Sequence, residues 1–159
     1  QVEFLRASAD CQVILPKDRP SLERSSLDVA DSSLPVVVVA TYGVDLAGLP
    51  AGDRASVIRR SLSITAKRAV ASKKYRNMVL SGGDVGFAVL RELGATAIEI
   101  HKEVLPGIAF GRVVGGEAHG MGIITKAGGF GDRMTLRGII AWLRLQRGEE
   151  PKDLEGVGG

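Results

Sequence analysis

Two short glycine segments carry the residue types that could hold a phosphate group. Ser81-Gly82-Gly83-Asp84 follows one apolar run, and Gly128-Gly129-Phe130-Gly131 follows another. After each segment the sequence changes to the spacing of an amphipathic helix. A glycine turn between a strand and a helix leaves backbone N–H groups free at the helix start, where they can bind phosphate oxygens. The pattern therefore predicts an anion site, and two such turns on neighbouring strands would suit a nucleotide.

Several side chains near these glycines have both a chemical and a structural interpretation. Asp84 could face Mg²⁺, which binds through few carboxylates plus phosphates, or could only stabilise a helix start. Lys126 could reach a phosphate as a compact charge or lie in solvent. Phe130 could stack on a base or anchor its loop, and His119 could be a base or incidental. The residue types alone leave these alternatives open.

Composition and missing motifs exclude several classes of protein. The sequence has no Gly-x-x-x-x-Gly-Lys-Ser/Thr loop, no Gly-x-Gly-x-x-Gly fingerprint after a first strand and no nucleophile elbow. One cysteine and two histidines argue against disulfides and histidine-based metal sites and fit a cytoplasmic location. A net charge of +3, without interleaved aromatics or a long basic run, argues against nucleic acid. No apolar run reaches the roughly 20 residues that span a membrane.

The elements that must position the glycines alternate between strands and helices. Apolar runs predict strands over residues 11–15, 35–40, 77–81, 97–103 and 121–125. Helical spacing predicts helices over 53–74, 84–93 and 134–146, with Asp53 as the first N-cap and Gly94 as the stop of the second. Residues 16–34 are expected to form a connector with a short helix near 27–30, and residues 1–9 the end of a helix.

This alternation predicts an α/β fold, with a mostly parallel sheet flanked by helices in a Rossmann-like layered domain. Ligands of such sheets bind at the carboxyl ends of the strands, so both glycine turns should face the same edge. We expect one nucleotide-binding domain over residues 1–147 and a flexible, glycine-rich tail over 148–159. Because the chain opens at Gln1 within a helical pattern, we also expect it to be part of something larger.

Four segments together resemble the C-terminal, nucleotide-binding domain of the four-carbon acid sugar kinases, formerly a domain of unknown function. They are Leu80–Asp84, Pro106-Gly107, Gly111–Gly116 and Thr125–Gly131, and their order and spacing agree across residues 77–145. The resemblance implies an ATP- and Mg²⁺-dependent kinase that phosphorylates a hydroxyl of threonate, erythronate or an oxo-tetronate. It also implies an N-terminal domain that holds the acid sugar and the catalytic base, without which this fragment would be inactive.

The resemblance assigns nucleotide contacts to residues of three glycine segments, whereas the Mg²⁺ contact of Asp84 is suggested by its residue type and position alone. The nucleotide-binding residues would be Ser81, Gly82, Gly83, Asp84, Val85, Gly86, Gly115, Gly116, Lys126, Gly128, Gly129, Phe130 and Gly131. The partners would be ATP or ADP and the acid sugar, and a homodimer is left open.

Two departures from the family pattern remove hydroxyl groups, namely Val85 in place of Thr and Ala127 in place of Ser. Backbone contacts would survive both. A non-catalytic nucleotide or phospho-metabolite binding module is therefore an alternative, and an assembly domain with purely structural glycine turns is a third.

Overall fold

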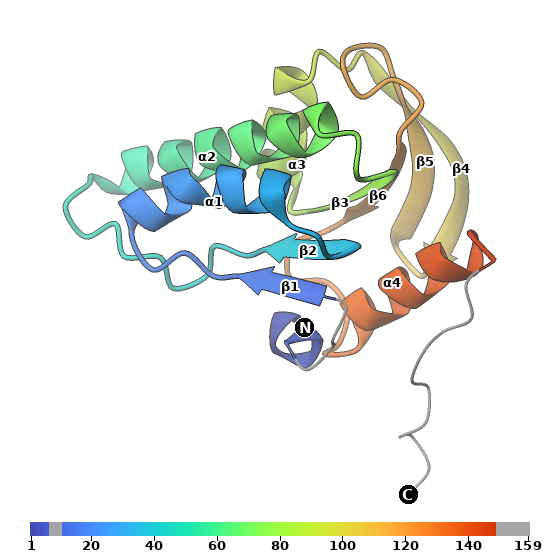
Figure 1. The fold of residues 1–159 in the computed structure, drawn as a ribbon, viewed down its shortest axis with the longest axis horizontal. Helices are drawn as coiled ribbons and strands as arrows, with labels where there is room; N and C mark the ends of the chain where they lie inside the picture. The colour runs from blue at the N-terminus through green and yellow to red at the C-terminus, as the bar shows by residue number, and fades with distance from the viewer. Residues whose placement is uncertain (7–10, 149–159) are drawn as a thin grey trace, which may run out of the picture.

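The computed structural model describes residues 1–6 and 11–148, so the predicted tail beyond Gly148 and part of the first predicted helix lie outside it. Figure 1 shows helices arranged on both sides of short strands. The elements in chain order are η1 (Val2–Leu5, a 3₁₀ helix), β1 (Cys11–Ile14), α1 (Arg19–Asp31), β2 (Val36–Val39), α2 (Ala51–Ala71), β3 (Asn77–Ser81), α3 (Gly83–Glu92), β4 (Ala97–Leu105), β5 (Ile108–Val114), β6 (Gly122–Lys126) and α4 (Thr135–Leu145). None of the described helices is long and apolar enough to cross a membrane.

The strands form two small sheets, so the prediction of one mostly parallel sheet is wrong, although the α/β class is right. β1 pairs with β2 in parallel, and the second sheet has the order β3-β6-β5-β4 with only β3 and β6 parallel. Connection lengths explain the difference. Pro106-Gly107, with Gly107 at φ +71°, joins β4 to β5 as a hairpin. The link over residues 115–121 is likewise too short for the helical crossover that parallel strands require.

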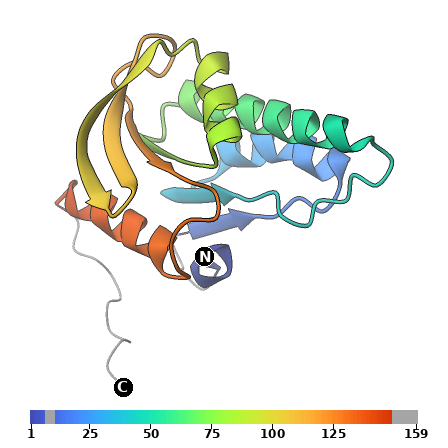
Figure 2. The same ribbon diagram turned by 180° about the vertical axis from the view of Figure 1, so that it is seen from behind.

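The four-stranded sheet is covered by helices on both faces, as Figures 1 and 2 show for α3 and α4. Successive residues of β6 serve the two layers because side chains alternate along a strand. Ile123 belongs to the core beneath α3 with Leu80 and Val89, whereas Ile124 packs with Ile108 and with Ile139 of α4. On the α3 side, α2 packs against α3 and α1 packs against α2. The layered arrangement therefore holds β3 and β6 firmly from both sides.

Capping residues account for the helix boundaries that differ from those expected. α1 begins much earlier than predicted because Asp18 and Ser21 form a capping box, in which the Ser21 N–H donates to Asp18 Oδ1 at 2.8 Å. α2 begins at Ala51 after Pro50, so Asp53 lies in its first turn and is not the N-cap. Gly94, at φ +69°, follows the end of α3 as predicted.

The central position of β6 gives a stability prediction. Ile124→Ala should lower the free energy of unfolding by about 2–5 kcal/mol, because it leaves a cavity between the sheet and α4. Ile100→Ala, the same change at a side chain that is 57% exposed, should alter it by about 0.5 kcal/mol or less. Urea unfolding followed by circular dichroism measures both. Equal effects would contradict the assignment of Ile124 to the core.

Candidate functional site

The two glycine turns that the sequence singles out lie side by side. β3 and β6 are adjacent parallel strands, with Ser81 opposite Lys126 at their carboxyl ends. The Gly82 N–H donates to the Lys126 carbonyl oxygen at 2.9 Å, and a Cβ atom added to Gly128 would lie 3.6 Å from the Gly82 Cα. The predicted convergence of both turns at one edge of the sheet is therefore confirmed.

The turn from β3 into α3 presents backbone amides to open space. Gly82 has φ +100°, a conformation that favours glycine, and α3 begins at the next residue. The N–H groups of Gly83, Asp84 and Val85 belong to the first helical turn, where no intrahelical acceptor exists and the helix dipole is positive. A Cβ atom added to Gly82 or Gly83 would meet nothing within 4 Å. This geometry suits an anion at the start of α3.

Gly86 serves the packing of α3 against β3, and Val85 can offer a ligand only its backbone. The Gly86 N–H donates to the Gly82 carbonyl oxygen at 2.9 Å, and its Cα face lies near Leu80 of β3. Gly86 therefore lets the helix approach the strand and does not offer a free amide. The Val85 side chain packs against the hydrophobic core, so only its backbone can face a ligand.

Lys126 shapes the second turn from below. Its side chain is only 4% exposed, and its ammonium group donates to the carbonyl oxygens of Ala127 (2.8 Å), Gly128 (2.9 Å) and Phe130 (2.8 Å). Burial lowers the pKa of this ammonium group. All three donors are used inside the loop, so Lys126 fixes the loop's curvature and places a positive charge beneath it. This role was neither of the two alternatives that the sequence suggested.

The far end of the second turn is held by contacts that the sequence analysis did not single out. Gln1 Nε2 donates to the carbonyl oxygens of Phe130 (3.1 Å) and Gly131 (3.3 Å). Asp132 Oδ1 accepts from the Met134 N–H (2.8 Å) and the Thr135 hydroxyl (3.1 Å), which lower the pKa of the Asp132 carboxyl. An aspartate two residues before a backbone N–H commonly accepts from it in a turn, so Asp132 was a readable turn signal before α4. The loop is therefore anchored at both ends.

Phe130 lies over the β4–β5 hairpin while remaining 46% exposed. A Cβ atom added to Gly107 would lie 3.2 Å from the Phe130 ring, so the absence of a side chain at Gly107 leaves room for the ring. This contact agrees with the anchoring alternative and leaves part of the ring facing solvent.

Gly115 and Gly116 do not lie with the other glycines, so the structure does not bring them to the two turns with which the resemblance groups them. They follow Val114, which pairs with Ala97 at the start of β4, at the opposite end of the sheet from Ser81. Side chains at these positions would collide with Thr96 and with the Leu93 backbone. Nearby, His119 Nδ1 accepts from the Gly115 N–H at 3.0 Å, which makes His119 part of the same turn. These residues join the end of α3 to the sheet.

Asp84, which directly follows the first turn, is the residue that the sequence analysis offers for a metal ion. It is exposed in the first turn of α3. Among the described residues, no group of three or more His, Cys, Asp or Glu could hold a metal ion. A cation here would need the phosphates of a ligand to complete its coordination, as Mg²⁺ commonly does.

Comparison with known proteins gives a family match over this region. The family described as the nucleotide-binding C-terminal domain matches residues 17–136. A D-threonate kinase of Bordetella bronchiseptica is 38% identical over 127 residues, which are 77% of this chain and 30% of that protein. A D-erythronate kinase of Heliobacterium modesticaldum is 41% identical over 76 residues, 46% of this chain and 17% of that protein. The match confirms the resemblance predicted from the glycine segments.

Solved structures give the same relationship. A Bordetella bronchiseptica protein, crystallised as a domain-swapped dimer with bound citrate, is 32% identical with a TM-score of 0.66, over 86% of this chain and 33% of that one. A Salmonella typhimurium protein called a putative tRNA synthase has a TM-score of 0.65 at 19% identity, which shows a shared fold alone. The chain thus spans about a third of the length of the relatives that it matches.

The three hydrogen bonds of Lys126 give a prediction for the loop. Lys126→Met should lower the free energy of unfolding by about 1–3 kcal/mol, because it leaves loop carbonyl groups without their donor. Lys17→Met, the same change at an exposed lysine, should have little effect. Thermal unfolding compares the two variants. Equal melting temperatures would show that the loop does not depend on this ammonium group.

Proposed function

Because the chain belongs to the nucleotide-binding C-terminal domain family of the four-carbon acid sugar kinases, we propose that it holds ATP for phosphoryl transfer to such an acid. The acceptor would be a four-carbon acid of the threonate or erythronate type, in line with the relatives' names. The observation that carries the proposal is the meeting of two glycine turns at the carboxyl ends of β3 and β6.

Each of the two turns would contact the phosphates from a different side. The amides of Gly83, Asp84 and Val85 would donate to one phosphate group at the positive end of α3. The loop of Gly128–Gly131 would face the same ligand from β6, curved by Lys126 from beneath. The buried ammonium would act through its charge, since its protons are already engaged. Ser81 lies between the turns, with its hydroxyl directed to the Gly128 carbonyl oxygen at 3.5 Å.

Mg²⁺ would enter this site together with the nucleotide. Asp84 would contribute one carboxylate and the ATP phosphates the other oxygen ligands. When bound, the cation would neutralise charge on the transferred phosphoryl group. Phosphoryl transfer depends mainly on such positioning and charge stabilisation, so little covalent chemistry is needed from this domain. The group that activates the acceptor hydroxyl would come from another part of a longer kinase polypeptide.

A non-catalytic binding module is the second candidate, and two observations favour it. The side chain of Val85 packs into the core and offers no hydroxyl, and Ala127 offers none either. The turns would then bind nucleotide without supporting turnover. Binding by the chain is common to both candidates, whereas activity of a full-length protein separates them.

Gly83→Ala tests the proposed phosphate contact directly. The added methyl group would enter open space in front of the first-turn amides, so the fold should be kept while the ligand is pushed away. We expect ADP and Mg·ATP to bind at least about tenfold more weakly, which corresponds to about 1.4 kcal/mol. Isothermal titration calorimetry measures the change.

Gly52→Ala is the matched control, because Gly52 also lies in the first turn of a helix, α2, and also has nothing within 4 Å of an added Cβ. It should leave nucleotide affinity unchanged. Equal affinities of the two variants would place the nucleotide elsewhere. If the unmodified chain shows no heat of binding and no rise in melting temperature with millimolar ADP, the proposal fails.

A further inference from the structure

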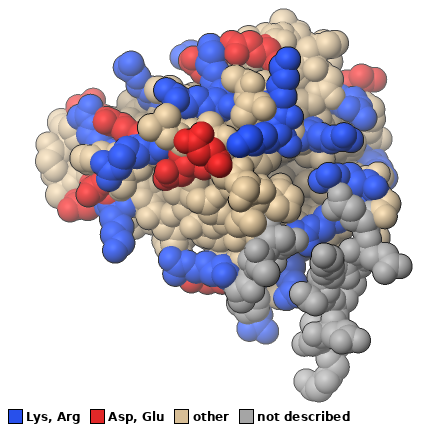
Figure 3. All heavy atoms as spheres, viewed as in Figure 1, with Lys and Arg blue, Asp and Glu red and all other residues tan. Residues whose placement is uncertain are grey.

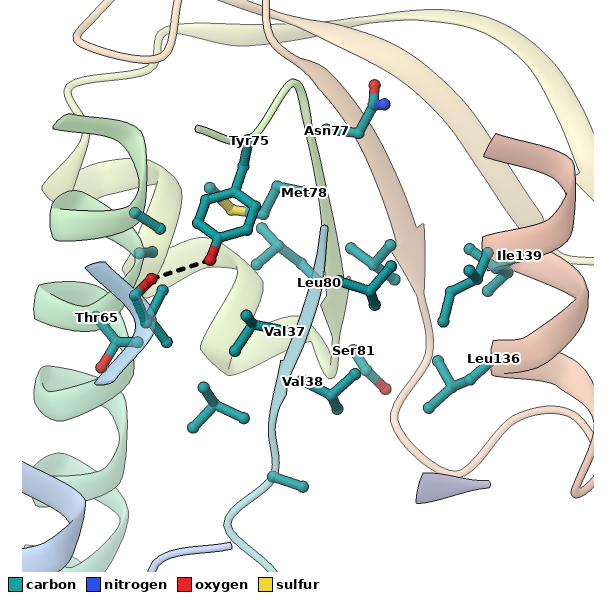
Figure 4. Close-up of a pocket in the computed structure, with 18 of the residues that line it drawn as sticks. Val37, Val38, Thr65, Tyr75, Asn77, Met78, Leu80, Ser81, Leu136 and Ile139 are labelled. Atoms are coloured by element: carbon teal, nitrogen blue, oxygen red, sulfur yellow. Dashed lines mark hydrogen bonds between the residues drawn. The ribbon is translucent and has the colours of Figure 1, made fainter. Parts of the chain in front are cut away.

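A large cavity separates the two sheets, and the glycine turns adjoin it at one end. Its volume is about 860 Å³. β2 (Val36–Val39) forms one side and β3 (Asn77–Ser81) the other, as Figure 4 shows. In the described part of the chain, β2 pairs only with β1 and β3 only with β6, so each has an unpaired edge. We call the cavity between these two edges the interstrand slot.

The two edges of the interstrand slot run in the same direction. In Figure 4 the labelled residues descend from Val37 to Val38 on β2 and from Met78 to Ser81 on β3. Each strand already has a parallel partner on its other side. A further strand with this direction could therefore pair with both and join the sheets in the order β4-β5-β6-β3-new-β2-β1. Unpaired strand edges present rows of N–H and C=O groups that favour such an addition.

The side chains of the two helices that line the slot favour an apolar strand. Leu62, Ala66 and Ala69 of α2 line it, as do Leu136, Ile140 and Leu143 of α4. A strand places alternate side chains on opposite faces, so its residues would meet one helix and then the other. Both sets of side chains must then be apolar, as in a buried parallel strand. Val36–Val39 shows the consequence, because a run of four valines is typical of a strand buried on both faces, whereas the structure leaves all four half-buried.

The surface around the slot fits an apolar occupant better than a charged one. Figure 3 shows a region without charged residues across the middle of this face, with Lys, Arg, Asp and Glu around it. The glycine turns touch only one end of the slot, through Ser81 and Gly128. A phosphate would bind at that end, outside the apolar part.

We propose that the interstrand slot receives one apolar β-strand of about five residues, supplied by the polypeptide that leads into Gln1 in a longer kinase chain. Gln1, Val2 and Leu5 line the slot. Gln1 also bonds to the loop after β6, so it lies at the carboxyl ends of β3 and β6. A strand parallel to β3 ends at that same edge, next to Gln1, and needs only a short loop to reach it. The length of β3, five residues, sets the length of the insert.

The source of the strand rests on the proposed function, because the kinases that this chain resembles are about three times as long and have residues to supply it. The relative that crystallises as a domain-swapped dimer provides the competing source, a second copy of the chain. The fit of a strand to the slot itself rests only on the two edges and the apolar walls.

The test extends the 159-residue chain at Gln1 with a strand of five valines and a Gly/Ser loop of two, four or six residues. We expect at least one loop length to slow amide exchange at least about tenfold on both edges, at Val37–Val39 and at Met78–Leu80. The melting temperature should rise by about 4 °C or more. The control replaces the third valine with proline, which cannot donate to a neighbouring strand. It should show neither effect.

Each other outcome overturns the proposal in a distinct way. Protection of one edge only means that the strand does not join the sheets, and equal effects of the proline control mean that any apolar tail suffices. If the unextended chain is already protected at both edges and sediments as a dimer, the second copy is the occupant. ADP titration of the same samples reports on the glycine turns separately. Loss of ADP binding with the exchange pattern intact would therefore refute only the proposed function.

Discussion

The parallel pairing of β3 with β6 is the constraint on which the candidate site depends. It sets Ser81 opposite Lys126, and the hydrogen bond from Gly82 to Lys126 extends it by one residue into the turns. Without that pairing, each glycine turn would be an ordinary connection between a strand and a helix. With it, the free amides of α3 and the loop after β6 face one volume of solvent, and the helices on both faces keep the two strands in register.

The sequence predicted the parts of the fold that local signals determine. The strand over residues 77–81 and the stop at Gly94 follow from an apolar run before glycines and from a glycine with positive φ. β5 was missed because Gly111 interrupts its apolar pattern. Gly111 is there because β4 lies so close that a side chain would collide with the Glu99 carbonyl oxygen. Such a reason is visible only after the strands are paired.

The site was predicted to a similar extent. Gly82, Gly83 and Gly128 were brought together because parallel strands share a carboxyl edge. Gly115 and Gly116 lie away from these turns, and their sequence gives no sign of it, because a glycine pair looks the same whether it faces a ligand or a neighbouring backbone. The role of Lys126 could not be read at all, since a lysine at a strand end gives no sign of whether its ammonium turns outward or under its own loop.

The order of the strands along the chain also affects when the site forms during folding. β4 and β5 are joined by two residues, whereas Asn77 pairs with Gly122 only after α3 and that hairpin have been enclosed. Closing a long loop is entropically slower than zipping a hairpin, so β3 and β6 meet late in folding. An anion held between their turns needs both turns in place, so it binds the folded chain and not the unfolded one. Such a ligand slows unfolding, and it leaves the folding rate nearly unchanged to the extent that the turns form after the transition state.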